Sequence, residues 1–136
     1  MQQPHNLVAL VTVLSLLLLL WKIVRVGGAR AKFGIEAPAV IGHPEFERHF
    51  RVQMNMIEGL VIFLPSLWLF AIYWNDLIAA ALGAVFLIGR VVYMLAYVKE
   101  PKSRSIGFGL QALAMILLLL GATAGAVRAL MVTGGV

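Results

Sequence analysis

Long apolar stretches alternate with short polar segments along the chain. Each stretch has about 20 residues or more, enough for a helix to cross about 30 Å of hydrocarbon. None shows the period-2 alternation of a membrane β-strand. The pattern predicts an all-α membrane protein, a four-transmembrane-helix bundle with helices over about 5–30, 46–74, 77–99 and 104–131, in a single domain covering residues 1–136.

Composition supports the same class. Hydrophobic residues make up 62% of the 136 residues and charged residues only 12%, whereas soluble domains carry about 25% charged residues. The sequence has no cysteine, which excludes a disulfide framework, a thiolate metal site and a cysteine nucleophile. The histidines His5, His43 and His49 are scattered, so no metal is expected.

The basic residues indicate a topology. Lys and Arg gather before the second apolar stretch and again between the third and fourth, while the turn after the second carries only Asp76. The positive-inside rule therefore places linkers 1–2 and 3–4 in the cytoplasm and both termini on the other side. No basic soluble face remains, so nucleic acid is not an expected partner. The residues counted for this topology are Lys22, Arg25, Arg30, Lys32, Arg48, Arg51, Lys99, Lys102 and Arg104.

Polar side chains run into the second apolar stretch. Arg51, Asn55 and Glu58 follow the spacing i, i+4, i+7 and project within about 40° of one another on a helix, forming one stripe. Gln53 lies about 200° round from Arg51 and faces another direction. An ionisable group at membrane depth costs about 2.5–3.5 kcal/mol on insertion scales, so such a group indicates a functional site.

The third stretch carries a second polar face. Arg90, Tyr93 and Tyr97 follow i, i+3, i+7 and share one side of a helix. Arg90 needs an anionic or carbonyl partner, and Glu58 is the only acid at comparable depth. We expect the two to pair directly or to join one ligand. The alternative is a purely structural ion pair, with the tyrosines in an interfacial aromatic belt.

Arg104 stands where the fourth helix is expected to begin. Pro101 ends the third helix, Ser103 is suited to cap the fourth, and Arg104 would open it. A cation there opposes the helix dipole by about 0.3–1 kcal/mol, and a locally unfavourable residue points to function. The alternative is an arginine that contacts lipid headgroups.

The polar residues singled out on these helices all belong near the cytoplasmic ends of helices two, three and four. They are Arg51, Asn55, Glu58, Arg90, Tyr93, Tyr97 and Arg104. Arginine forks bind carboxylates, a glutamate accepts an ammonium group, and amides and phenols complete the hydrogen bonds, which suits a small molecule with carboxylates and an amine. If that ligand carries a thiol, the same positive field favours its thiolate. Lowering a thiol pKa by about two pH units takes about 2.7 kcal/mol, which one partly desolvated arginine supplies.

The combined motif resembles a known family. It consists of Pro44-Glu45-Phe46-Glu47-Arg48, Arg51-x-Gln53-x-Asn55-x-x-Glu58, Arg90-x-x-Tyr93-x-x-x-Tyr97 and Arg104. This motif is similar to that of the membrane-associated proteins in eicosanoid and glutathione metabolism, the MAPEG family, above all its leukotriene-C-synthase and microsomal glutathione transferase branch. The resemblance covers roughly residues 20–120. It implies a homotrimer of four-helix subunits with glutathione bound in clefts between neighbours.

The resemblance also implies roles for single residues. In that branch, the position matching Arg104 activates the thiol, and those matching Arg30 and Gln53 reach in from the adjacent subunit. Arg90 and Arg48 are expected to have structural or supporting roles. The positions that bind glutathione within one subunit match Arg51, Asn55, Glu58, Tyr93 and Tyr97.

Three positions depart from the patterns of relatives. Gly59 stands where the branch has a tyrosine that helps to hold glutathione, which implies weaker affinity or a wider site. Ala31 replaces a second arginine beside Arg30. Met56 stands where the prostaglandin-E-synthase branch has an aspartate, so isomerase chemistry is less favoured.

The sequence thus predicts a membrane-bound glutathione transferase, with glutathione peroxidase activity as a second reaction. The second substrate would be a hydrophobic electrophile or a lipid hydroperoxide arriving through the membrane lipid. The short segment after the fourth helix fits a protein of the bacterial inner membrane. Two other classes compete: a non-enzymatic lipid- or glutathione-binding protein, and a small four-helix multidrug antiporter, although the first apolar stretch lacks the acid that an antiporter needs.

Overall fold

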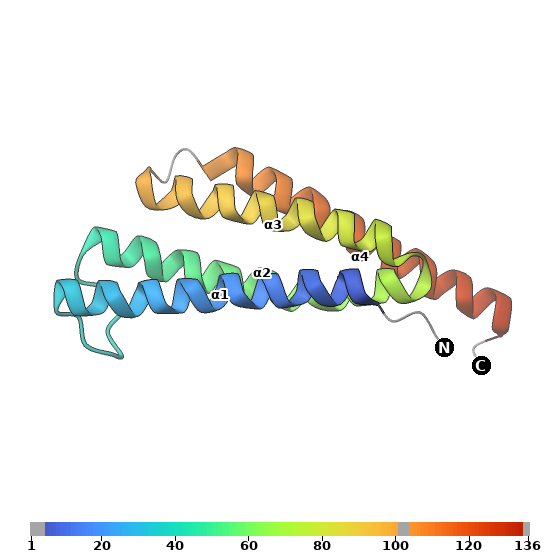
Figure 1. Ribbon diagram of the computed structural model, residues 1–136, viewed down its shortest axis with the longest axis horizontal. Coiled ribbons are helices and arrows are strands. Elements are labelled where there is room, and N and C mark those ends of the chain that lie inside the picture. The colour runs from blue at the N-terminus through green and yellow to red at the C-terminus, as the bar shows by residue number, and fades with distance from the viewer. Residues whose placement is uncertain (1–4, 101–103, 135–136) are drawn as a thin grey trace.

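The computed structural model describes residues 5–100 and 104–134. It contains four helices, α1 (Asn6–Phe33), α2 (Pro44–Tyr73), α3 (Asp76–Lys99) and α4 (Ser105–Thr133) (Figure 1). Each is long and apolar enough to cross a membrane. The predicted all-α architecture with four membrane-spanning helices is therefore confirmed.

Local chemistry explains where the helices begin and end. Helix α1 runs to Phe33 because Gly34 adopts the left-handed conformation, at φ 64°, which closes a helix. Helix α3 begins after Asn75, whose side chain accepts a hydrogen bond from the Ile78 amide at 3.0 Å. Helix α4 begins at Ser105 with Arg104 in the N-cap position, and the cap predicted at Ser103 lies outside the described residues.

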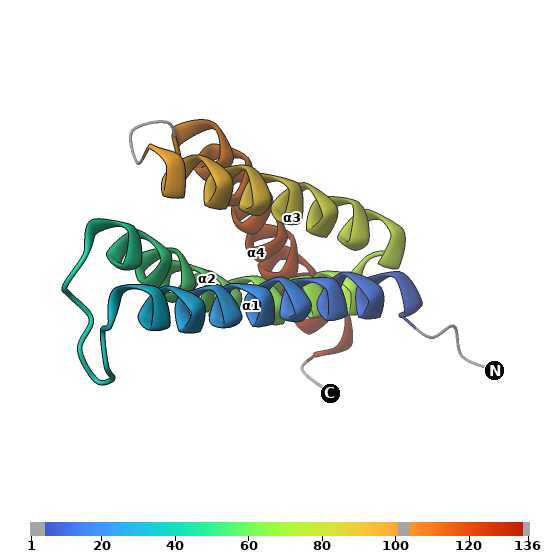
Figure 2. The same ribbon diagram turned by 60° about the vertical axis from the view of Figure 1, so that its left-hand side comes forward.

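The helices form a bundle in which α1 begins and α4 ends at one end, while the α1–α2 linker, the end of α3 and the start of α4 lie at the other (Figure 1). Helix α1 packs on α2 and α3, and α4 packs on α2 and α3 from their other side. Toward the linkers the α3–α4 pair diverges from the α1–α2 pair in both views (Figures 1 and 2). The core between α2 and α3 includes Phe63 and Phe86, whose stacked rings lie 3.8 Å apart.

Two glycines set the approach of α3 to α4. A Cβ atom added at Gly107 would lie 2.3 Å from the Tyr93 backbone nitrogen, and one at Gly89 would lie 2.7 Å from the Gln111 nitrogen. The backbones are therefore in contact at this level, which small residues allow in membrane helices. This contact fixes the register that brings Tyr93 and Gln111 to the same part of the bundle.

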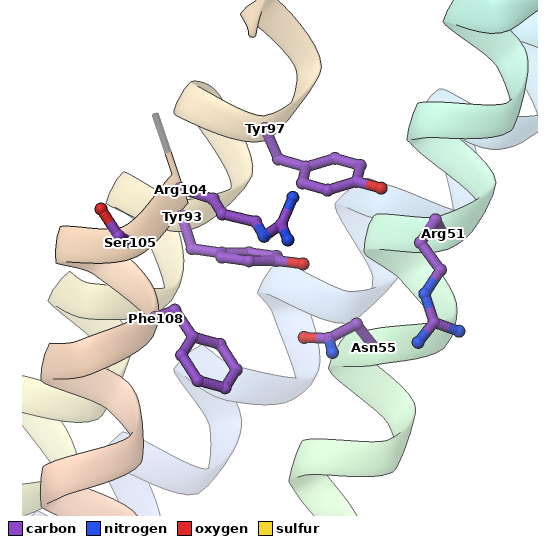
Figure 3. Close-up of a pocket in the computed structure, with 7 residues that line it drawn as sticks. All are labelled: Arg51, Asn55, Tyr93, Tyr97, Arg104, Ser105 and Phe108. Carbon is purple, nitrogen blue, oxygen red and sulfur yellow. The ribbon is translucent and has the colours of Figure 1, made fainter. Parts of the chain in front are cut away.

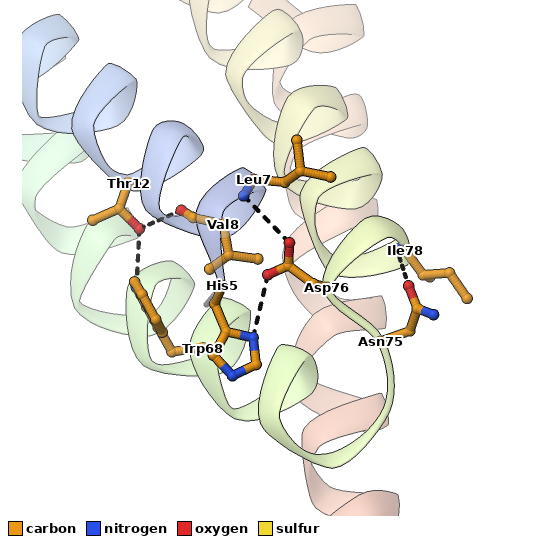
Figure 4. A network of polar contacts seen from close by, with 8 residues as sticks. All are labelled: His5, Leu7, Val8, Thr12, Trp68, Asn75, Asp76 and Ile78. Atoms are coloured by element: carbon orange, nitrogen blue, oxygen red, sulfur yellow. Dashed lines mark hydrogen bonds and ion pairs between the residues drawn. The ribbon is translucent and has the colours of Figure 1, made fainter. Parts of the chain in front are cut away.

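Asp76 ties the opposite end of the bundle together (Figure 4). Its carboxylate accepts from the Leu7 amide at 3.3 Å and lies 3.3 Å from His5 Nδ1. Helix α1 has no acidic residue in its own first turn, so the acid of α3 satisfies one of its unpaired amides. The indole of Trp68 donates to Thr12 Oγ1 at 2.9 Å and joins α2 to the same end of α1.

Candidate functional site

A cavity of about 620 Å³ opens between α2 and the α3–α4 pair, near the linker end. Helix α2 contributes one wall, helix α3 contributes two tyrosines, and the start of α4 contributes the rest (Figure 3). Five of its lining residues are among those that the sequence singles out, so segments far apart in the chain meet here. The lining residues are Arg51, Asn55, Tyr93, Tyr97, Arg104, Ser105 and Phe108.

The two walls of this cavity differ in chemistry. Figure 3 shows the Arg104 guanidinium beside the two tyrosine rings, with Arg51 and Asn55 on the facing wall. The rings of Tyr93 and Tyr97 stack with centroids 5.6 Å apart, and Arg104 lies over Tyr97 at 5.7 Å. Among the described residues that line the cavity there is no carboxylate. Two guanidinium groups and the N-terminus of α4 therefore create a positive potential suited to an anionic ligand.

Glu58 lies beside this cavity rather than in it. It pairs with Arg51 at 3.6 Å, and both side chains are 56% exposed. Glu58 lines a smaller neighbouring cavity of about 180 Å³, which shares Asn55 and Phe108 with the first. An exposed pair of this kind contributes about 0–1 kcal/mol. A ligand that carries both a positive and a negative group can therefore replace the Arg51–Glu58 ion pair with little loss of free energy.

Arg90 has different partners from those predicted. Its Nη1 donates to Asn55 Oδ1 and to Gln111 Oε1, the latter at 2.9 Å, and its Nη2 donates to the Val52 carbonyl at 3.0 Å. The predicted direct pair with Glu58 is wrong, because neutral oxygens from α2 and α4 occupy the buried fork while Glu58 pairs with Arg51 near the surface. That one ligand joins Arg90 and Glu58 stays a prediction.

These contacts orient the Asn55 amide. Because a guanidinium only donates hydrogen bonds, the Asn55 side chain must turn its oxygen toward Arg90. Its amide N–H groups are then available to the cavities that Asn55 lines. Arg90 lies over the Tyr93 ring as well, at 4.7 Å. It thus supports two residues of the large cavity without lining that cavity itself.

Sequence reasoning missed Gln111, which is 4% exposed and holds Arg90 from α4. The available signal was a polar residue inside the fourth apolar stretch, near its start. Ser105 and Phe108 were missed too, since neither has a distinctive spacing.

Within the described residues, no group of three or more His, Cys, Asp or Glu side chains is placed to hold a metal.

The remaining predicted residues lie elsewhere in this chain. Arg30 donates to the Ala39 carbonyl at 2.8 Å in the α1–α2 linker. Arg48 donates to the Val98 carbonyl at 3.4 Å and links α2 to the end of α3, a structural contact. Gln53 is half-buried and lines neither of the two cavities described above. A role for Arg30 and Gln53 in a neighbouring subunit's site stays a prediction.

Gly59 borders the smaller cavity. Among the described residues, a Cβ atom added there would find the Phe86 ring at 4.0 Å and no closer neighbour. The space that a larger side chain would occupy is therefore open in this chain.

Comparison with known proteins gives a consistent result. Residues 8–124 match the MAPEG family. An uncharacterized protein of Synechocystis sp. is 48% identical over 114 residues, 84% of this chain and 83% of that protein. Microsomal glutathione S-transferase 2 of Homo sapiens is 41% identical over 117 residues, 85% of this chain and 80% of that protein. Leukotriene C4 synthase of Cavia porcellus is 36% identical over 125 residues, 92% of this chain and 83% of that protein.

The match extends over nearly the whole chain, and it confirms the resemblance seen in the motifs. Together with four helices able to span a membrane, it identifies an integral multi-pass membrane protein. The chain belongs to the MAPEG family.

Proposed function

We propose that this protein is a membrane-bound glutathione transferase. The observation that carries the proposal is the cavity of about 620 Å³ in which Arg51 and Asn55 face Tyr93, Tyr97 and Arg104. Relatives that cover most of the chain are named as a glutathione S-transferase and as leukotriene C4 synthase. A positive cavity with amide and phenol groups suits the carboxylates and thiol of glutathione.

The residues of α2 bind the ends of the tripeptide. Arg51 forms charge-assisted hydrogen bonds to a carboxylate, and Glu58 accepts the ammonium group. These two side chains pair with each other at 3.6 Å. Bound glutathione would replace this one ion pair with two, from its carboxylate to Arg51 and from its ammonium group to Glu58. Asn55, oriented by Arg90, donates to a ligand oxygen.

Arg104 acts on sulfur. It stands at the N-cap of α4, so its guanidinium and the helix N-terminus both favour an anion close by. The thiol loses its proton to water, and the thiolate remains beside Arg104 and the tyrosine rings. No covalent bond to the protein forms, and catalysis rests on proximity and electrostatic activation.

The electrophile reaches the thiolate from the bilayer. In transfer, a carbon–sulfur bond forms and the leaving group departs with its electron pair. In the peroxidase reaction, the thiolate attacks a hydroperoxide oxygen, the O–O bond breaks, and the alkoxide takes a proton to become an alcohol. The resulting sulfenic acid then reacts with a second glutathione to give the disulfide and water.

The functional unit that we propose is a homotrimer in which each chain is one four-helix domain. Arg30 and Gln53 would complete the cleft of a neighbour, which is consistent with their lying outside the chain's own cavity. The protein would reside in a bacterial inner membrane with linkers 1–2 and 3–4 in the cytoplasm, in accord with their basic residues.

Ultraviolet absorbance of the thiolate tests the proposal. Adding glutathione to the purified protein should produce a thiolate band near neutral pH. A non-enzymatic binder would show binding without the band, and an antiporter would show neither, so either result would refute the proposal.

Arg104→Ala should lower turnover with a general electrophile about 10²-fold, as when one transition-state donor is removed. Glutathione affinity should change much less, because a neutral thiol adds little to ground-state binding. Tyr93→Phe and Tyr97→Phe are the controls. If a tyrosine variant loses the thiolate band while Arg104→Ala keeps it, the catalytic assignment belongs to the tyrosine.

A further inference from the structure

A second buried cation, Lys22 of α1, has no role in the site described above. Its side chain is only 2% exposed. It lies 4.9 Å from the Trp21 ring centroid, and it forms no hydrogen bond or ion pair within residues 5–100 and 104–134. The sequence counts Lys22 among the charges that set topology, but a topological charge has no reason to be buried. A desolvated ammonium group without an acceptor calls for an anion.

Lys22 lines a cavity of about 330 Å³ between α1 and α3. Arg25 and Lys99 line it too, together with His49 of α2, which is 3% exposed and whose Nδ1 has no hydrogen-bond partner in the described part of the chain. None of the described residues that line this cavity is acidic. The neighbouring Glu45 pairs instead with Lys32, at 3.6 Å. The cavity therefore gathers positive charge without an internal counter-charge.

The walls of this cavity are largely apolar. They include Trp21 from α1 and Leu95 from α3, both of them exposed on the surface of the bundle. Trp21 and Lys22 directly follow the run 7–20, which is apolar except for two hydroxyl residues. Lys99 ends α3. Tryptophan and lysine at the end of a membrane-spanning run are typical of the headgroup level.

We propose that this cavity binds one anionic phospholipid from the leaflet on the linker side. The phosphate accepts hydrogen bonds from Lys22, with Arg25 and Lys99 at its mouth, and an acyl chain lies along the apolar wall of α3. A free phosphate ion is also an anion, but it has no apolar part to cover that wall. Within the part of the chain that the structure describes, the cavity shares no lining residue with the cavity proposed for glutathione, so this site stands whether or not the protein is a transferase.

Native mass spectrometry of the delipidated protein in detergent tests this proposal. Phosphatidylglycerol and phosphatidylcholine with identical acyl chains serve as probes, and inorganic phosphate serves as the soluble competitor. Wild type should retain one phosphatidylglycerol per chain and bind phosphatidylcholine at least tenfold more weakly. Lys22→Met should lose at least tenfold in phosphatidylglycerol affinity. Arg128→Met, which removes one positive charge from an exposed position on α4 away from this cavity, should bind like wild type.

Three results would overturn the proposal. Equal retention by wild type and Lys22→Met would show that the buried ammonium does not bind the phosphate. Equal binding of the two lipids would show that the headgroup charge is not recognised. Displacement of the lipid by inorganic phosphate at equal concentration would assign the site to a soluble anion. The double variant Arg25→Gln/Lys99→Gln changes only exposed residues and should also lose affinity, which keeps the test valid should Lys22→Met fail to fold.

Discussion

Arg90 and Lys22 are both cations buried within membrane-spanning helices, at 1% and 2% exposure, yet their surroundings differ completely. Arg90 gives its two Nη groups to oxygens of Asn55, Gln111 and Val52. Lys22 contacts an indole ring and a cavity lined by other cations. Burial alone therefore does not define what a charge does. The hydrogen-bond donors of Arg90 find acceptors within the chain, whereas the ammonium of Lys22 finds an acceptor only when the proposed lipid binds.

The difference follows from the chemistry of the two side chains. A guanidinium carries five donors in a rigid fork and can satisfy neutral acceptors on two neighbouring helices at once. Arg90 does so between α2 and α4, and only its Nε has no hydrogen-bond partner in the described part of the chain. An ammonium on a flexible stem is a compact point charge that suits a phosphate.

Removing Arg90 should have the largest effect on stability. Arg90→Met leaves the side-chain oxygens of Asn55 and Gln111 without the donor that they share, and a buried unsatisfied group costs about 1–3 kcal/mol. We expect the free energy of unfolding to fall by at least about 2 kcal/mol, seen as a lower Tm by circular dichroism in detergent. Glutathione binding should weaken too, because Asn55 loses its orientation.

Arg90→Lys is the matched control for charge. It keeps the positive charge but not the fork, so it should recover only part of the lost stability. Full recovery by lysine would mean that charge rather than hydrogen-bond geometry is what α2 and α4 require, and the contrast with Lys22 would fail.

The exposed charges of α2 should behave in the opposite way. Arg51→Ala and Glu58→Ala should each weaken glutathione binding by at least about 1.5 kcal/mol, since each leaves a charged ligand group without its partner. Tm should hardly move, because their mutual ion pair is exposed and contributes little. Calorimetric titration beside thermal unfolding separates the two quantities, and unchanged affinity in both variants would remove α2 from the binding site.

The sequence predicts features that one helix determines by itself. The lengths of the apolar runs predict four helices, and the spacing of Arg51 and Glu58 predicts that they share a face, which their ion pair confirms. The partners of Arg90 are not predictable in this way. Gln111 meets Arg90 because Gly89 and Gly107 let α3 and α4 touch, and no periodicity within one helix encodes that register.

The burial of Lys22 is also not predictable from the pattern of one helix. Its position at the end of an apolar run indicates an exposed topological charge, whereas the packing of α1 against α2 and α3 buries it. The cavity beside it is formed by three helices together. Likewise, the stripe on α2 predicts a polar site, but only the bundle decides that Glu58 faces a separate, smaller cavity.

The smallest change in stability is expected for Lys22→Met, and it tests the contrast between the two buried cations most directly. Lys22→Met keeps much of the side-chain volume and removes a buried charge that has no acceptor of its own. In delipidated detergent the free energy of unfolding should therefore stay unchanged or rise by up to about 1 kcal/mol, because replacing a poorly compensated buried charge with an apolar group is often neutral or stabilising. Arg90→Met removes the same charge with the same replacement and should do the reverse.

Added phosphatidylglycerol should then raise the Tm of wild type and of Arg128→Met but not that of Lys22→Met, since a ligand stabilises only the folded state that binds it. Thermal unfolding of these proteins and of Arg90→Met, with and without the lipid, gives all the values needed. A loss of stability in lipid-free Lys22→Met as large as that in Arg90→Met would mean that Lys22 has a structural partner of its own. The two buried cations would then be equivalent, and the difference drawn between them would be wrong.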